Sequence, residues 1–183
     1  MGVHEAYHLD PINRIIHWIC IPIELCAVLK LLDALPGPLD VGILAILSVG
    51  AVYLAADLAA GVLMVLLLLA LRAFATTLTT GTPVHDAGLA IVTFVAAFVF
   101  QTRVGHGVFE QEIDDTEKNV AELRRTGNPI PILLVFYYHL LELLFAAGYR
   151  PALCRAIEEH RADELKRIPA DPRTRSRALV SSS

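Results

Sequence analysis

The feature that most constrains the fold is an almost uninterrupted apolar run from residue 41 to 71, in which Asp57 is the one charged residue and Gly61 follows it closely. A helix needs about 20 apolar residues to cross the hydrocarbon core of a bilayer, so this run is too long for one span and short for two. We interpret it as two helices, at about 40–56 and 59–80, that reverse direction near Asp57. One long tilted helix is the alternative.

The rest of the chain adds further helical segments. Asp10-Pro11 is typical of a helix start, with Asp10 as the N-cap and Pro11 in the first helical position. That helix is expected to extend to about residue 34, with a kink at Pro22. Further apolar helices are expected at about 84–104, closed by Arg103, and from Pro129 to about 147, followed by a charged amphipathic helix at 152–167.

Composition indicates a membrane protein. Hydrophobic residues make up 55% of the chain, which is high for a soluble domain. The predicted fold class is all-α, a multispanning transmembrane helical bundle of about five apolar helices plus a C-terminal amphipathic helix. We expect a single integral membrane domain at 1–168 and a disordered tail at 169–183, and a mostly soluble helical bundle is the structural alternative. The net charge of −4 gives no indication of nucleic-acid binding.

The topology makes a prediction about which polar residues meet. With a reversal at Asp57, the helix at 84–104 ends on the membrane face from which the first helix starts. This places His106 and Glu110 on the same face as His8 and His17. His85, at the opposite end of its helix, is expected to lie roughly 30 Å away.

The segment Gly105–Glu110 is the strongest candidate for chemistry. His106 and Glu110 are four residues apart and share one face if the backbone is helical. Imidazole and carboxylate groups suit iron, zinc or manganese. A simple ion pair, or a satisfied polar group at the membrane surface, is the alternative for each residue. His17 and Glu24, seven residues apart, share one stripe of the first helix, and ionisable groups there are expected to face protein or water.

A second polar pair lies in the last apolar helix. His139 and Glu142 are at positions i and i+3. They are expected either to form a hydrogen-bonded pair, or to leave Glu142 as an acid that orients a ligand or faces the substrate. Asp57 is expected to cap a turn.

Several short motifs together resemble a known family. They are Tyr7-His8-x-Asp10-Pro11-x-Asn13-x-x-x-His17, Pro22, Gln101-x-x-x-Gly105-His106-Gly107-Val108-Phe109-Glu110, and Glu142-x-x-Phe145-x-x-Gly148-Tyr149-x-Pro151. This combination is similar to the iron-dependent 2-hydroxy fatty acid dioxygenases, which are small multispanning membrane proteins. The resemblance covers about residues 5 to 155.

The resemblance implies an activity and a set of site residues. It implies that Fe(II) and O2 remove one carbon from a 2-hydroxy fatty acid, a step of fatty acid α-oxidation. The implied metal ligands are His8, His17 and His106. The other matching polar positions, implied to be catalytic, are Asn13, Glu110 and Glu142, with Glu110 either a fourth ligand or an orienting group. From their location, Arg14 or Arg103 is expected to pair with the substrate carboxylate.

The expected partners are a long-chain 2-hydroxy fatty acid, O2 and the lipid bilayer. The resemblance implies the inner membrane if the source is bacterial and the endoplasmic reticulum if it is eukaryotic. Small residues at Gly42, Gly50 and Gly61 are compatible with helix packing within one protomer or in a homo-oligomer. Two other functions stay open: a zinc-dependent lipid hydrolase, and a non-enzymatic proton-linked membrane carrier that uses Glu24, His17 and Glu142.

Overall fold

The computed structural model describes residues 10–110, 123–128 and 130–167, and no strand occurs among them. The elements are α2 (Pro11–Asp33), α3 (Val41–Ala56), α4 (Leu58–Thr77), α5 (Pro83–Phe100), the π-helical segment η1 (Gln101–Glu110), α7 (Ile130–Ala146) and α8 (Pro151–Arg167). The all-α class and the expected helices are confirmed. The tail predicted at 169–183 lies outside the described residues.

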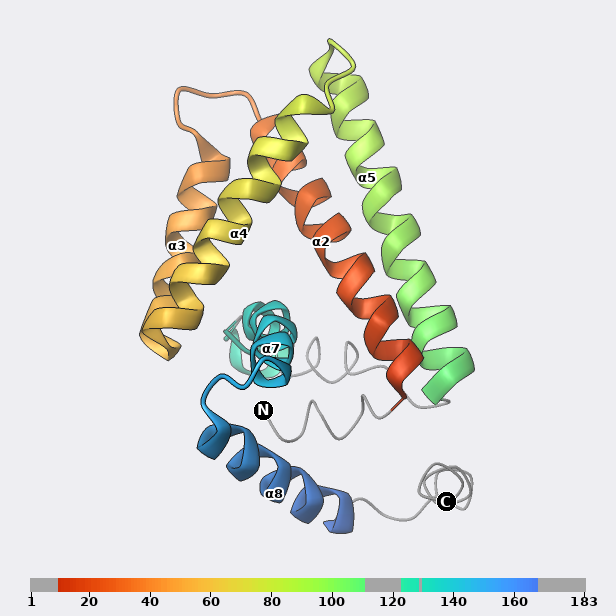
Figure 1. Cartoon of the computed structure of the whole chain (residues 1–183). Coiled ribbons are helices and arrows are strands. Elements are labelled where there is room, and N and C mark those ends of the chain that lie inside the picture. Colours follow the sequence, from red (N-terminus) through yellow and green to blue (C-terminus); the bar gives the residue numbers. More distant parts are fainter. Residues whose placement is uncertain (1–9, 111–122, 129, 168–183) are drawn as a thin grey trace.

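The helices form two packed pairs that meet at one end (Figure 1). Helices α3 and α4 run side by side, and so do α2 and α5. The pairs approach each other where α2 contacts α4, which we call the narrow end, and separate toward the wide end. Helix α7 is seen nearly end-on between the two pairs toward the wide end, where it contacts α2, α3 and α4, and α8 lies beyond it.

The start of α2 is defined by its first residues. The Asp10 carboxylate accepts a hydrogen bond from the Ile12 N–H at 2.7 Å, and Pro11 occupies the first turn. An acceptor at this position satisfies a backbone donor that the helix itself leaves without a partner. The predicted helix start is therefore confirmed, and it places Asn13, Arg14 and His17 at the wide end.

The chain reverses at Asp57, as predicted. Asp57 has an extended backbone between α3 and α4, and its carboxylate accepts from the Ala60 N–H at 3.0 Å. The Tyr149 hydroxyl donates to the same carboxylate at 2.8 Å, and Arg150 forms an ion pair with it. One side chain therefore caps α4 and also holds the segment that joins α7 to α8.

Close packing joins α3 to α4. A Cβ added to Gly61 would lie 2.7 Å from the Leu54 backbone, so only glycine permits this approach. A second glycine, Gly50 of α3, is packed as closely, because a Cβ added to it would lie 2.8 Å from the Val65 side chain. These two glycines therefore serve packing within one protomer.

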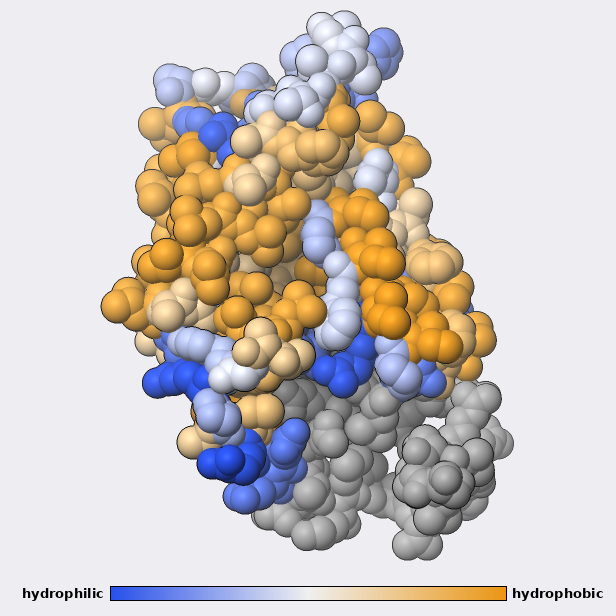
Figure 2. All heavy atoms as spheres, in the orientation of Figure 1, coloured by the Kyte–Doolittle hydropathy of each residue, from blue (hydrophilic) through white to orange (hydrophobic). Residues whose placement is uncertain are grey.

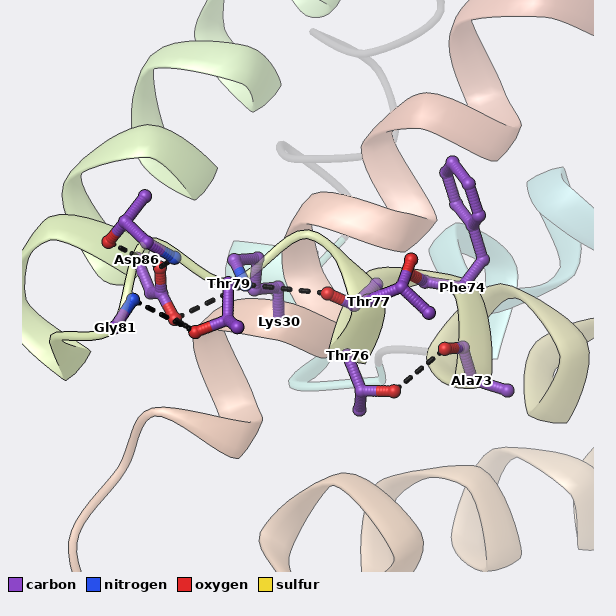
Figure 3. A network of polar contacts seen from close by, with 10 residues as sticks. Lys30, Ala73, Phe74, Thr76, Thr77, Thr79, Gly81 and Asp86 are labelled. Carbon is purple, nitrogen blue, oxygen red and sulfur yellow. Dashed lines mark hydrogen bonds and ion pairs between the residues drawn. The ribbon is translucent and has the colours of Figure 1, made fainter.

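The narrow end is held by charged side chains. Lys30 of α2 pairs with Asp86 of α5 at 3.4 Å, and Asp86 also accepts from the Thr79 and Thr80 hydroxyls at 2.9 Å and 2.7 Å (Figure 3). Nearby, Arg72 of α4 pairs with Asp33 at 3.0 Å and with Asp40 at 2.8 Å. These contacts link α2, α4 and α5 through polar groups at the end opposite His106.

The outer surface suits a bilayer. Within the described ranges, three helical stretches are long and apolar enough to cross one, namely Pro11–Asp33, Leu58–Thr77 and Pro83–Phe109, and two shorter apolar stretches are Val41–Ala56 and Leu133–Ala146. Figure 2 shows a broad hydrophobic surface over the two helix pairs, with hydrophilic residues at the narrow end and around α8. The 20 residues of α4 correspond to about 30 Å, close to the thickness of a bilayer core.

One expected boundary is wrong. Arg103 does not close its helix, because the α-helix ends at Phe100 and the chain continues as the π-helical η1 to Glu110. At the transition, the Thr102 hydroxyl donates to the Phe98 carbonyl at 2.9 Å. Such a side-chain bond competes with the regular i→i−4 backbone pattern and favours a change of helix type.

The close contact at Gly61 predicts that adding one methyl group there lowers the stability of the fold. Gly61→Ala should lower the unfolding midpoint in detergent by about 5 °C, because overpacking typically costs about 1–3 kcal/mol. Gly88→Ala is the matched control, since nothing lies within 4 Å of its added Cβ. It should be neutral or slightly stabilising. Equal midpoints for the two variants would contradict the close packing of α3 on α4.

Asp57 predicts an acid-sensitive fold. The backbone hydrogen bond from Ala60, aided by Tyr149 and Arg150, holds the pKa of Asp57 below its ordinary value. A depressed carboxyl pKa contributes stability above the unfolded pKa of about 4, and that stability is lost as the pH falls through the folded pKa. The unfolding midpoint should therefore drop between about pH 5 and pH 3, and Asp57→Asn should be less stable at neutral pH and show a flatter profile. An unchanged slope in the variant would show that other carboxylates dominate.

Candidate active site

The candidate site begins with His17, a buried side chain of α2. Its ring Nδ1 lies 2.9 Å from the Asn13 carbonyl oxygen. A carbonyl can only accept, so Nδ1 carries the proton and, in the neutral ring, the lone pair lies on Nε2. A metal-binding imidazole is commonly oriented in this way by a backbone carbonyl.

His106 of η1 lies against His17, as the topology predicted. Their ring centroids are 4.9 Å apart in an edge-to-face arrangement, and both side chains are 4% exposed. Gly105 permits this approach, because a Cβ there would fall 2.2 Å from the Asn13 Oδ1. The glycine before His106 therefore lets η1 pack directly onto the start of α2.

A third imidazole, His139 of α7, joins this pair. Its ring lies 5.3 Å from His17 and nearly parallel to it, at 29°. Its Nδ1 lies 3.2 Å from Glu142 Oε2, so the predicted His139–Glu142 pair is confirmed. An ionised carboxylate can only accept, so His139 has the same tautomer as His17, with the lone pair on Nε2.

The sequence did not predict that His139 would lie beside His17. The i, i+3 spacing with Glu142 indicated a polar pair, but nothing local indicates that α7 crosses the wide end. That position depends on contacts far apart in the chain, such as the Tyr53 hydroxyl donating to the Leu133 carbonyl at 2.8 Å. Tyr53 also stacks on Tyr137, with ring centroids 5.1 Å apart.

Arg14 links Glu142 to α2. The Arg14 Nε lies 3.6 Å from Glu142 Oε1, and the guanidinium lies 5.7 Å from the centre of the Trp18 ring. Glu142 is 7% exposed, so its charge is balanced in a region that is largely shielded from solvent. A chain of contacts therefore connects Arg14, Glu142, His139 and His17.

Asn13 is fully buried beside these rings. Among the described residues, neither its Nδ2 nor its Oδ1 has a hydrogen-bond partner. Buried amides are costly to leave without a partner, so this group indicates a place for a polar ligand or water. Gln101 of η1 shows the same feature at its buried Oε1, and the sequence analysis did not single it out as a site residue.

The other expected site residues are placed differently. His8 lies outside the described residues, and of Glu110 only the backbone is described. Arg103 is exposed on η1. Glu24 is buried farther along α2, with one oxygen that has no partner among the described residues. His85 lies at the narrow end, opposite His106, as expected.

The donor chemistry of the cluster suits a metal. Three imidazoles and a carboxylate suit iron or zinc, and two of the rings are oriented by acceptors at Nδ1. Within the described part of the chain, no three His, Cys, Asp or Glu side chains are already arranged to hold an ion. The cluster therefore fits a metal by its groups and their orientation, and the complete ligand set stays a prediction.

Comparison with known proteins adds independent information. A sequence profile described as 2-hydroxy-palmitic acid dioxygenase Mpo1-like matches residues 1–120. The 2-hydroxy-palmitic acid dioxygenase MPO1 of Saccharomyces cerevisiae is 31% identical over 164 residues, which cover 86% of this chain and 85% of the yeast protein. No solved structure matches. The profile match includes Asn13, His17 and His106 and ends before α7.

The close contact between Gly105 and Asn13 predicts that a side chain at position 105 weakens metal binding. Gly105→Ala should displace Asn13 and disturb the carbonyl that orients His17, lowering metal affinity about 10–100-fold. Gly107→Ala is the matched control, because its Cβ would meet only the Thr102 carbonyl at 3.7 Å. Metal titration of both purified variants, beside their unfolding midpoints, is the measurement. Equal affinity in the two variants would rule out this role for Gly105.

Proposed function

The chain belongs to the 2-hydroxy-palmitic acid dioxygenase Mpo1-like family, and we propose that it shortens 2-hydroxy fatty acids by one carbon with Fe(II) and O2. In the balanced reaction, a 2-hydroxy acid and one O2 yield the acid one carbon shorter, carbon dioxide and water. The observation that supports this proposal best is the cluster of His17, His106 and His139 in a buried site between apolar helices.

We propose that His17 and His106 hold the iron, with His8 contributed by the segment before α2. His139 is added to this set because its ring lies 5.3 Å from His17 and has the tautomer that leaves Nε2 able to bind a metal. Bound ferrous iron supplies the one-electron chemistry that O2 needs in order to react with the acid. Glu110 remains proposed as a fourth ligand or an orienting group.

The protein side chains then bind and orient. Asn13, whose buried amide has no partner among the described residues, is proposed to donate to the hydroxyl or carboxylate of the substrate. Glu142 accepts from His139 Nδ1 and keeps the proton on that nitrogen, while Arg14 balances its charge. The site at the wide end lets a polar head enter while the acyl tail stays among apolar helices.

The membrane setting supports a long-chain substrate. Burial of each CH₂ contributes about 0.8 kcal/mol relative to water, so a long acyl tail partitions into the bilayer that surrounds these helices. We propose an integral protein of the inner membrane in a bacterium, or of the endoplasmic reticulum in a eukaryote. The apolar surface in Figure 2 supports the membrane location in general.

The test is metal content followed by turnover. The detergent-purified protein should retain iron, and His106→Ala should lose it. His139→Ala should lower iron affinity about 10–100-fold. His85→Ala is the matched control, because His85 is an imidazole at the narrow end. After anaerobic iron loading, native protein with 2-hydroxypalmitate and O2 should form the fifteen-carbon acid, measured by mass spectrometry, and His106→Ala should not.

Other outcomes would redirect the proposal. Retained zinc with oxygen-independent lipid hydrolysis would favour a hydrolase. Equal metal in the native protein and His106→Ala, or none in either, would remove His106 as a ligand and favour a proton-linked carrier. Normal iron affinity in His139→Ala would leave His139 as a packing partner of His17.

A further inference from the structure

An open groove of about 630 Å³ runs along one face of α5 and ends at η1. Apolar side chains between Ile91 and Phe100 line most of it, including Val95 and Ala96, and Arg103 lies at its end. Ligand sites are commonly apolar, have volumes of about 300–1,000 Å³, and carry few polar groups. This groove shares the apolar lining, and the charged group among its described lining residues, Arg103, lies on the segment that carries His106.

The groove lies on the face of α5 that faces away from α2. On its other side, α5 packs against α2 through Ala97, which joins a small core with Ile16 and Cys20. On the groove side, Val92 is 66% exposed and Val95 is 51% exposed. In a bilayer, this face meets acyl chains directly, so a lipid tail can enter it sideways without crossing water.

Arg103 differs from the other candidate cation, Arg14. Arg14 is paired with Glu142 and lies over Trp18. Arg103 is exposed, and no carboxylate in the described part of the chain pairs with it. An arginine at the end of an apolar groove complements a long-chain carboxylate, because the guanidinium can bind both of its oxygens.

We propose that the α5 groove holds the acyl tail of the 2-hydroxy fatty acid on its way to the site, and that Arg103 binds its carboxylate. This inference rests on the proposed dioxygenase function. The tail is already in an apolar medium, so the groove does not draw it from water but selects it by length and head group. Arg103 is therefore a substrate-binding residue, distinct from the imidazole cluster.

The length of the groove fits a chain of about sixteen carbons. Ile91 and Arg103 are twelve residues apart, which at about 1.5 Å per residue is about 18 Å. An extended chain advances about 1.2 Å per bond, so about 15 bonds fill this distance. Ala96 lies seven residues from Arg103, at about 10 Å, opposite roughly the ninth carbon.

These distances define the first test. Ala96→Trp should block the groove beyond about the ninth carbon, lowering kcat/KM for 2-hydroxypalmitate about tenfold and sparing 2-hydroxyoctanoate. Leu66→Trp is the matched control, because Leu66 is an exposed apolar residue of α4. It should leave both substrates unaffected. Arg103→Gln should raise KM about tenfold with little change in kcat, and Arg103→Lys should recover only part of that loss, because an ammonium group keeps the charge but lacks the two-pronged guanidinium.

A second measurement needs neither iron nor turnover. A 2-hydroxy fatty acid with a photoreactive diazirine near its tenth carbon should label the Pro83–Phe100 helix of the metal-free protein. Excess 2-hydroxypalmitate should remove that labelling and leave any labelling of α4 unchanged. Labelling spread equally over α4 and α5, without competition, would overturn the groove proposal.

The outcomes separate this inference from the proposed function. If the native protein turns over 2-hydroxypalmitate and Ala96→Trp behaves as Leu66→Trp does, the groove proposal is wrong and the dioxygenase proposal stands. If the native protein turns over no 2-hydroxy acid, the dioxygenase proposal fails. Competed labelling of α5 would then still establish a fatty-acid groove.

Discussion

The fold depends on the reversal at Asp57. Because its carboxylate caps α4, the apolar run divides into two antiparallel helices, and α5 then returns to the end where α2 begins. Without this reversal, His17 and His106 would lie at opposite ends of the helices. The same carboxylate accepts from Tyr149 and pairs with Arg150, which fixes the end of α7 near the site. One polar side chain therefore determines both the topology of the spans and the position of the third imidazole.

The site buries polar side chains, which is energetically costly unless they form hydrogen bonds. The two histidines named next form theirs within their own helices. His17 donates to a carbonyl of its own helix, and His139 donates to a carboxylate of its own helix. Each ring is thus oriented before any ligand binds, as effective metal sites require. Asn13 and Gln101 are exceptions, because each has a buried side-chain amide atom with no partner among the described residues. The Asn13 amide lies beside Gly105, where η1 packs against α2.

The two ends of the helices have different roles. At the narrow end, ion pairs such as Lys30–Asp86 link helices through groups that are already satisfied. At the wide end, the helices separate and α7 closes the space between them. Among the described residues, little protein packs on the outer face of α5, where Val92 is 66% and Val95 is 51% exposed. The charged contacts between helices and the buried imidazole cluster thereby lie at opposite ends of one bundle.

Local patterns in the sequence determined the helices, the Asp10 cap, the reversal at Asp57 and the shared location of His17 and His106. Each follows from short-range chemistry, or from counting how often an apolar chain crosses a bilayer. Only the tertiary structure decided that His139 stacks beside His17. It also decided that Arg14 pairs with Glu142 while Arg103 lines a groove. These features depend on how helices distant in sequence pack against one another, and no local pattern of residues encodes that packing.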